Sequence, residues 1–272
     1  MRLRADFHTH TVYCDGANTP VQMAEAAWRM GFTDFGFSGH EDFSFCTPGF
    51  GLVPERFEQY RKEILQLKEQ YAGRMNIYLG IERDCLGPGT GEAEYVIGST
   101  HCIEKNGNYV SVDDTEEGLC RDVERLWGGD WYAFARDYFE LEATVGERTR
   151  CDWVGHFDLL TKFNERDRHF DTKRDDYIEP ALTAMKRLCR EGLPFEINTG
   201  AISRGYRTVP YPSAFLLKEL CSMGGRIIIT SDSHSARTIG WQFDMAQKLA
   251  WECGFRKTLV LKPGGGFREI EL

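Results

Sequence analysis

Six of the seven histidines follow short apolar segments, and this placement constrains the fold more than any other feature of the chain. The first two stand in Asp6-Phe7-His8-Thr9-His10, where the alternation of a β-strand would point Asp6, His8 and His10 to one face. Polar residues close the later apolar segments in the same way: His40, Glu82, His101, His156, Asp232 and His234. Buried unpaired charge is costly, so this gathering of imidazoles and acids predicts a polynuclear metal site.

Short apolar segments alternate with amphipathic ones, which predicts an α/β fold with a mainly parallel sheet. The expected strands cover residues 3–8, 34–38, 76–81, 95–100, 152–155, 194–198, 226–230 and 258–261. The expected helices cover residues 21–30, 54–71, 115–126, 131–145, 175–190, 212–223 and 240–253. The first helix has Pro20 at its start and Gly31 at its end, which is the favoured arrangement.

No linker or low-complexity segment divides the 272 residues, so we expect a single domain over residues 1–272. Functional residues of a parallel barrel gather where strands end and helices begin, and every candidate ligand falls at such a position. The Gly/Phe-rich segment 41–53 follows His40. It is interpreted either as a flap over the site or as a surface loop with aromatic anchors.

Charge and hydropathy narrow the classes of function. A net charge of −9 disfavours non-specific binding to nucleic acid or to an anionic membrane, because both are negative. A small anionic substrate is still compatible, since a metal cluster can dominate the local field. No apolar run approaches the roughly 20 residues that span a bilayer, and the N-terminus leaves no room for a signal peptide. We therefore expect a cytoplasmic protein with no nucleic-acid and no membrane partner; the sequence does not predict an oligomeric state.

The nine cysteines are odd in number and include no CxxC pair, which indicates reduced thiols. Four of them lie near the histidine motifs: Cys14, Cys46, Cys85 and Cys102. These four could ligate metal, but a role as small core residues is favoured.

Six motifs occur in a fixed order over nearly the whole chain: Asp6-x-His8-x-His10, Ser38-Gly39-His40, Gly80-Ile81-Glu82, Gly98-Ser99-Thr100-His101, Gly155-His156-Phe157-Asp158 and Ser231-Asp232-Ser233-His234. They resemble the successive motifs of the PHP (polymerase and histidinol phosphatase) superfamily. The segment Glu196–Gly200, followed by Arg204-Gly205-Tyr206 and Pro210-Tyr211-Pro212, is similar to the histidinol-phosphate phosphatase branch. The resemblance implies a distorted, TIM-like (β/α)7 barrel with three divalent ions at the C-terminal ends of its strands.

The resemblance also assigns the metal ligands, motif by motif. The first ion would take His8, His10, Glu82 and Asp232; the second would share Glu82 with His101 and His156; the third would take Asp15, His40 and His234. Mixed imidazole and carboxylate ligands suit zinc, iron or manganese better than calcium or magnesium. Glu82 is the expected bridge, because one carboxylate can give an oxygen to each of two ions.

Asp15 stands where many members of the superfamily place a histidine. Its alternative role is that of a turn residue, because Asp-Gly is a strong turn signal. Asp84 would orient a ligand or form a loop salt bridge, and Asp158 would support His156 or cap a helix. Asp6 would hydrogen-bond a ligand imidazole. The seventh histidine, His169, is expected to lie outside the site.

The activity implied by the resemblance is hydrolysis of L-histidinol phosphate to L-histidinol and phosphate, a step of histidine biosynthesis. Two ions about 3.5–4 Å apart would hold a bridging hydroxide for in-line attack. Glu82, Asp232 and His234 are the predicted catalytic residues. Acids expected to be available for the substrate's amine and imidazole are Glu41, Asp42 and Asp84.

Three cationic residues after strands are expected to bind the substrate phosphate. Arg204 would bind it in a fork, and Lys162 would bind as a point charge where related enzymes often carry arginine. Arg207 could substitute for either residue. The alternative role for all three is a solvated loop charge.

Four other functions stay open at this point. The nearest is a PHP phosphoesterase that acts on a nucleotide or another small phosphorylated metabolite. A nuclease is disfavoured by the acidic chain, and a deacetylase is disfavoured by the phosphate-binding residues. The fourth is a metal-dependent binding protein without turnover, which would hydrolyse no phosphate ester.

Overall fold

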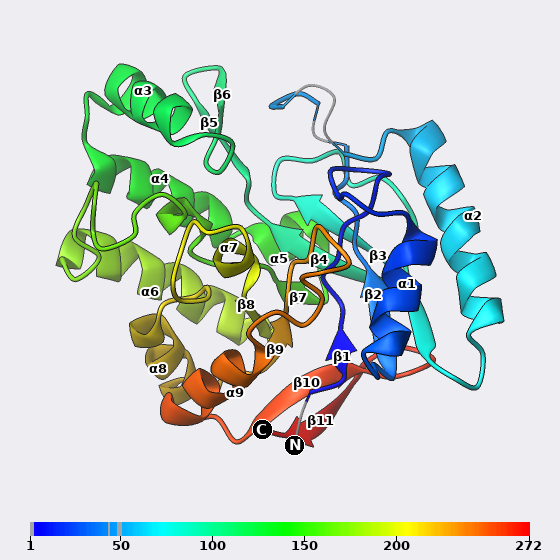
Figure 1. The fold of residues 1–272 in the computed structure, drawn as a ribbon. Coiled ribbons are helices and arrows are strands. Elements are labelled where there is room, and N and C mark those ends of the chain that lie inside the picture. The colour runs from blue at the N-terminus through cyan, green and yellow to red at the C-terminus, as the bar shows by residue number, and fades with distance from the viewer. Residues whose placement is uncertain (1–2, 43, 48–50) are drawn as a thin grey trace.

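A central sheet of parallel strands is surrounded by helices in the computed structural model, which describes residues 3–42, 44–47 and 51–272 (Figure 1). Within these residues, seven neighbouring strands pair in parallel, in the order β1 (Ala5–Asp6), β2 (Asp34–Phe37), β3 (Asn76–Asp84), β4 (Tyr95–Ser99), β7 (Trp153–Val154), β8 (Phe195–Asn198) and β9 (Ile227–Thr230). The predicted α/β architecture is confirmed.

The first and last of these seven strands meet just beyond their carboxyl ends. The His10 amide donates to the Ser233 carbonyl at 2.8 Å, and the Ser233 amide donates to the His8 carbonyl at 3.1 Å. At the opposite end, β9 also pairs in parallel with β10 (Lys257–Leu261), which is followed by the antiparallel strand β11 (Phe267–Glu271). The barrel is therefore distorted: its strands are joined at the histidine-bearing end, and β10 and β11 lie at the other (Figure 1).

Helices cover the outside of the sheet, with α1 and α2 on one side and α4, α6, α8 and α9 on the other (Figure 1). Their bounds are α1 (Pro20–Arg29), α2 (Pro54–Gln70), α3 (Glu116–Trp127), α4 (Trp131–Glu142), α5 (Val145–Thr149), α6 (Asp175–Arg190), α7 (Gly200–Ser203), α8 (Ala214–Ser222) and α9 (Phe243–Glu252), with a 3₁₀ turn η1 (Leu159–Thr161). Local chemistry sets these ends. Thr19 and Gln22 form a capping box at the start of α1, and Gly31 follows its end with φ +83°.

Tyr95 fills the centre of the sheet, and two glycines make room for it. A Cβ atom at Gly36 or Gly80 would lie 2.4 or 2.1 Å from atoms of the Tyr95 side chain. The buried ring stacks on Trp153 with 5.1 Å between centroids. Its hydroxyl group donates to the carbonyls of Phe7 at 2.7 Å and Phe37 at 2.9 Å. Tyr95 thus ties β4 to the ends of β1 and β2, directly below the histidine motifs.

Several expected elements differ from those observed. β1 covers Ala5–Asp6 rather than residues 3–8. The helix expected over 131–145 ends at Glu142, and a separate short helix, α5, begins at Val145. The antiparallel hairpin of β5 (Cys102–Lys105) and β6 (Asn108–Ser111) was not predicted, nor was β11. These strands contain exposed charged and polar residues, so they do not show the apolar runs on which strand prediction relied.

The expectation that every thiol is reduced is wrong. Cys46 and Cys102 form a disulfide with 6.6 Å between their Cα atoms, and the other seven cysteines are free. The bond links segment 41–53 to the start of β5. Phe45 also packs on Tyr109 of β6, with 5.0 Å between ring centroids. Because 56 residues separate the two cysteines in sequence, only the tertiary fold brings them together.

The described part of segment 41–53 fits the predicted loop with an aromatic anchor. Residues 43 and 48–50 of the predicted flap lie outside the described residues. Glu41 and Leu52 form a parallel bridge at the base of the segment. Across the described parts of the chain, no helix is both long and apolar enough to pass through a bilayer.

Candidate metal centre

The carboxyl ends of the parallel strands bring the sequence-predicted ligands together at one rim of the sheet. His8 and His10 follow β1, and the others follow or end later strands: His40 (β2), Glu82 (β3), His101 (β4), His156 (β7), Asp232 and His234 (β9). These side chains are almost wholly buried except for His234, which is partly exposed. Side chains separated by more than 200 residues in sequence therefore share one site.

Glu82 lies at the centre of the site. Its Oε1 atom is 2.9 Å from His156 Nε2 and 3.3 Å from His101 Nε2, and it also accepts a hydrogen bond from Ser99 Oγ at 2.7 Å. Its Oε2 atom faces three other imidazoles, at 2.9 Å from His40 Nδ1, 3.1 Å from His8 Nε2 and 3.6 Å from His10 Nε2. The two carboxylate oxygens thus face different sets of histidines, which is the geometry of a bridging ligand.

The histidines also govern the ionisation of Glu82. Complete burial would by itself raise the pKa of this carboxyl group, but the surrounding imidazoles outweigh burial. His8 has the largest of these opposing effects, and together they hold the pKa well below its usual range. The carboxylate is therefore ionised and ready to bind cations.

Asp232 approaches the same cluster from β9. Its Oδ1 atom is 3.2 Å from His10 Nε2 and 3.7 Å from His8 Nε2, and its Oδ2 atom accepts from Arg204 Nη2 at 3.1 Å. The backbone at Asp232 has φ +47°, an unusual conformation for a residue that is not glycine. Such backbone positions often occur at functional sites.

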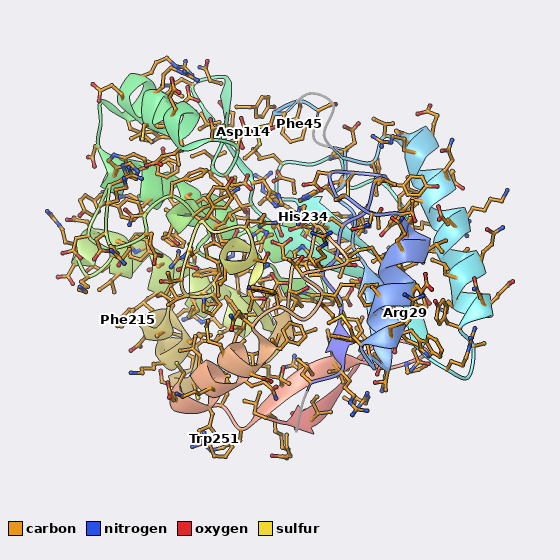
Figure 2. All side chains as sticks on the ribbon, in the orientation of Figure 1. Arg29, Phe45, Asp114, Phe215, His234 and Trp251 are labelled. Atoms are coloured by element: carbon orange, nitrogen blue, oxygen red, sulfur yellow. A yellow bond between two sulfur atoms is a disulfide. The ribbon has the colours of Figure 1, made fainter. Side chains whose placement is uncertain are left out.

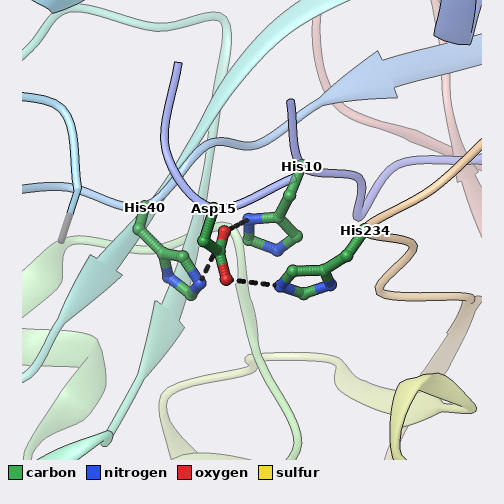
Figure 3. Close-up of side chains that lie close together, drawn as sticks. All are labelled: His10, Asp15, His40 and His234. Carbon is green, nitrogen blue, oxygen red and sulfur yellow. Dashed lines mark ion pairs between the residues drawn. The ribbon is translucent and has the colours of Figure 1, made fainter. Parts of the chain in front are cut away.

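Asp15 joins three histidines, as Figure 3 shows. Its carboxylate oxygens lie 2.9 Å from His234 Nε2, 3.5 Å from His10 Nδ1 and 3.7 Å from His40 Nε2. Asp15 is also in a turn, because the Gly16 amide donates to the Thr11 carbonyl at 2.9 Å. The two interpretations of Asp15 are therefore compatible: the turn directs its carboxylate into the cluster.

The donor atoms fit divalent metal ions. They form four groups in which all candidate ligand atoms lie within 4.8 Å of one another: His10-Asp15-His40-His234, His8-His10-Glu82, His8-His156-Asp232 and His40-Glu82-His101. Three buried atoms in this cluster, His8 Nε2, His10 Nε2 and Glu82 Oε2, make no hydrogen bond. Buried polar atoms usually have partners, and a cation would supply one here. The mixed nitrogen and oxygen donors suit zinc, iron or manganese.

Glu196 supports this cluster and was not predicted to do so. Its Oε1 atom accepts from His8 Nδ1 at 2.7 Å, which directs His8 Nε2 toward Glu82. Its Oε2 atom accepts from the His156 amide at 2.9 Å and from Asn198 Nδ2 at 2.8 Å. The sequence does contain a signal for this supporting role. A glutamate inside the apolar strand expected over residues 194–198 needs a buried partner.

The predicted supporting acids have different outcomes. Asp84 orients a ligand as expected: its Oδ2 atom accepts from the His101 amide at 2.8 Å and lies 3.4 Å from His101 Nδ1. The prediction that Asp6 contacts an imidazole is wrong. Asp6 instead accepts hydrogen bonds from the backbone and side chain of Ser231, and thereby fixes the loop that carries Asp232.

Asp158 fulfils neither of its expected roles. Its Oδ2 atom accepts from the Ser213 amide at 3.2 Å, and its side chain does not cap η1. His169 lies outside the metal-ligating groups, as expected, and pairs with Glu116 at 2.8 Å. Cys14 Sγ lies 3.6 Å from His10 Nδ1, but burial raises the pKa of the Cys14 thiol to about 12, which disfavours a thiolate ligand.

A cavity of about 190 Å³ opens onto the cluster, and two cationic side chains line it. Arg204 contacts Asp232 and donates through Nη1 to His234 Nδ1 at 2.7 Å. Lys162 is buried and lies 3.3 Å from Asp113 Oδ2. Arg207 is not among the described residues that line the cavity. Its guanidinium group instead donates to the Thr161 carbonyl at 3.2 Å.

The acids near the substrate cavity are not those expected from the sequence. Besides the candidate ligands Asp15 and Asp232, the described lining includes Asp113 and Asp114, which follow β6. Glu41, expected near the substrate, instead accepts from the Thr90 amide at 2.6 Å. Asp42 and Asp84 are also absent from the described lining. The unpredicted β5–β6 hairpin explains the difference, since it delivers the acidic segment to the rim.

Comparison with known proteins agrees with this geometry. The family model described as PHP domain matches residues 6–200. The chain is 26% identical over 280 residues to a probable histidinol-phosphatase of Schizosaccharomyces pombe, with coverage of 94% of this chain and 89% of that protein. It is 23% identical over 267 residues to the histidinol-phosphatase of Bacillus subtilis, with coverage of 89% and 97%.

A solved structure shows the same fold. It is histidinol phosphate phosphatase of Lactococcus lactis, complexed with zinc, L-histidinol and phosphate. The TM-score is 0.69 at 20% sequence identity, and the alignment covers 94% of this chain and 96% of that one. At this identity the likeness concerns the fold.

Proposed function

Since this chain belongs to the PHP domain family, we propose that it is a metal-dependent phosphatase that hydrolyses L-histidinol phosphate to L-histidinol and inorganic phosphate. Relatives named for this activity align with nearly its whole length. The observation that carries the proposal is the convergence of histidines and acids on Glu82, beside a cavity with two cationic side chains. The partner is a small phosphorylated molecule, and a cytoplasmic location stays a prediction.

We assign the ligands to three divalent ions, with zinc, iron and manganese as the candidates. The sets are His8, His10, Glu82 and Asp232; Glu82, His101 and His156; and Asp15, His40 and His234. This division follows the family resemblance. The shortest distances within the sets are His156 to Glu82 at 2.9 Å, His234 to Asp15 at 2.9 Å and His8 to Glu82 at 3.1 Å, and His40 of the third set also lies 2.9 Å from Glu82. When bound, such ions polarise phosphoryl oxygens and lower the pKa of water, which is the chemistry that phosphate-ester hydrolysis needs.

The side chains of this protein hold the reacting groups in place. Glu82 joins two ligand sets, Asp232 links the first set to Arg204, and His234 links the third set to Arg204. These contacts support catalytic roles for Glu82, Asp232 and His234. Glu196 fixes the ring orientation of His8, so that its Nε2 atom faces the cluster.

Arg204 and Lys162 are the proposed phosphate-binding residues, because both line the cavity beside the cluster. The Arg204 guanidinium group offers several donors in one plane, which suits phosphate oxygens. Arg207 supports this wall indirectly through Thr161, the residue before Lys162. We therefore assign substrate contact to Lys162 and Arg204, and we reassign Arg207 to support of the loop.

Phosphate release from L-histidinol phosphate, measured together with elemental analysis of protein purified without chelator, tests the proposal. Glu82→Ala should remove two ions and lower kcat/KM by about 10³-fold or more, because several kcal/mol of transition-state stabilisation depend on the bridged pair. Glu69→Ala, on the exposed side of α2, is the matched control and should behave as wild type.

Two results would contradict the proposal. Full turnover by Glu82→Ala would exclude the bridging role. Absence of phosphate release with zinc, iron and manganese each supplied would exclude the activity. A higher kcat/KM for a nucleoside monophosphate, in a panel of phosphorylated metabolites, would assign the alternative substrate class.

A further inference from the structure

The cavity beside the metal cluster has two charges of opposite sign next to each other in its wall. Lys162 Nζ lies 3.3 Å from Asp113 Oδ2, and it also donates to the Asp113 backbone carbonyl. Both residues line the cavity, together with the candidate ligands His101 and His156. A substrate that enters this cavity therefore meets a cation and an anion side by side, close to the cluster.

Asp113 is held firmly by the chain on both sides. Val112 is fully buried, and its amide donates to the His101 carbonyl at 2.8 Å. On the other side, the Thr115 side chain caps α3 by accepting from the Gly118 amide at 3.2 Å. Asp113 thus has a fixed position relative to His101, and preorganised groups lose little entropy when they bind a ligand.

The Asp113 carboxylate can accept a further hydrogen bond. Oδ2 faces Lys162, and Oδ1 has only a long contact of 3.5 Å from Ser111 Oγ. The side chain is 26% exposed, so the cavity can reach it. Burial would by itself raise the pKa of Asp113, but Lys162 and then His101 outweigh burial and lower it. The group is therefore an anion in the wall of the site.

The proposed substrate has complementary charges in the same close arrangement. Its ammonium group and its phosphate ester stand on adjacent carbons, so that a cation lies beside an anion. Because Lys162 and Arg204 line the same cavity as Asp113, a phosphate held by both cations would leave the adjacent ammonium group free to approach the Asp113 carboxylate. Opposite charges across such a contact favour the correct ligand, and a ligand that lacks the cation loses the contact with this partly exposed carboxylate.

We propose that Asp113 is a specificity-determining residue that accepts a hydrogen bond from the ammonium group of the substrate, so that the site selects phosphate esters of 2-amino alcohols. This inference rests on the proposed phosphatase function and adds the group by which the substrate is chosen. Asp114 follows in sequence and is exposed, and it also belongs to the described lining of the cavity (labelled in Figure 2). Glu117, exposed on α3 and outside that lining, provides an acid for comparison.

The test compares two matched esters: L-histidinol phosphate and its analogue without the amine, 3-(imidazol-4-yl)propyl phosphate. Wild type should prefer the amine-bearing ester by about 10- to 100-fold in kcat/KM, the range for a hydrogen bond to a charged group. Asp113→Asn should remove most of this preference by lowering kcat/KM for the amine-bearing ester, and should change the analogue less than about threefold. Glu117→Gln should keep the wild-type preference.

Equal losses for both esters in Asp113→Asn would overturn the inference, because they would show that Asp113 serves only to position Lys162. A wild-type enzyme without preference for the amine would also overturn it, while leaving the phosphatase proposal intact. Calorimetric binding of L-histidinol to the metal-loaded protein gives a readout that does not depend on turnover. Asp113→Asn should weaken this binding by about 10-fold or more, and unchanged binding would refute the role of Asp113 even if no ester were hydrolysed.

Discussion

Individual buried acids in this protein have distinct roles, and their partners determine which role each has. Glu196 accepts from His8 and Thr230, so it is stabilised as an anion that orients a ligand. Glu142, at the end of α4, is equally buried, but burial raises its pKa to about 8 and the nearby Thr100 hydroxyl only partly opposes this. A buried carboxyl group stays protonated near neutral pH when hydrogen bonds and nearby cations offset little of the cost of burying its charge.

Glu142→Gln should stabilise the protein more at high pH than at low pH. The unfolded chain releases the Glu142 proton near its ordinary pKa of 4.5, whereas the folded protein holds it to about pH 8. Between these values the folded state binds more protons, so wild-type stability falls as pH rises, by at most about 1.4 kcal/mol per pH unit. Urea unfolding at pH 5 and pH 8 measures the difference. Glu140→Gln, exposed on the same helix, is the control; an advantage of Glu142→Gln that does not grow with pH would contradict the assigned pKa.

At the scale of elements, the sequence pattern did not predict the β5–β6 hairpin, and this hairpin shapes the site more than any other unpredicted element. It begins at Cys102, directly after His101, and leads into the acidic segment at the cavity wall. The disulfide to Cys46 and the contact between Phe45 and Tyr109 attach segment 41–53 to this hairpin. Phe45 and Cys46 are thus held against the hairpin.

Cys46→Ser should lower the free energy of unfolding by about 2–4 kcal/mol, because the crosslink no longer restricts the unfolded chain across a long loop. The two cysteines are 56 residues apart, which places this loop among those for which the effect is substantial. Denaturant unfolding without reductant measures the loss. Cys189→Ser, which removes a free thiol on α6, is the matched control. If wild type and Cys46→Ser remain different in the presence of a strong reductant, the disulfide is not the cause.

At the scale of the whole molecule, the candidate metal cluster and the hydrophobic core lie at different ends of the barrel. A single hydrophobic cluster extends from Leu3 to Leu261 below the site. At the rim, the strands instead present imidazoles and carboxylates that come from β1, β2, β3, β4, β7 and β9. Ions bound there would link nearly every parallel strand of the barrel.

Removal of metal by a chelator should therefore lower the melting temperature as well as abolish phosphatase activity. An ion present at 100 times its Kd adds about 2.7 kcal/mol of stability, which corresponds to about 5 °C for a chain of this size. Calorimetry before and after chelation, with zinc or manganese added back, measures the effect. Activity that survives complete removal of metal, confirmed by elemental analysis, would contradict a metal centre.

The fold class and the strand-end positions of the candidate ligands were largely predictable, because their signals are local. An apolar strand that ends in a histidine or an acid can be read from a few adjacent residues, as at His40 and Glu82. The strands themselves follow from short apolar runs, as at Ile227–Thr230. The role of Glu196 was not predicted, although a charged residue inside an apolar strand is a local signal. Its partner, His8, is 188 residues away in sequence, so only the tertiary fold identifies the contact.

By itself, the sequence determined the alternation of strands and helices, the strand-end positions of the candidate ligands and the chemical type of the cluster. Only the tertiary structure decided which side chains meet: Glu82 with five histidines, Cys46 with Cys102, and Asp113 with Lys162. The physical reason is that periodicity and capping act between near neighbours. Contacts between distant segments depend on how the whole barrel packs, which no local pattern specifies.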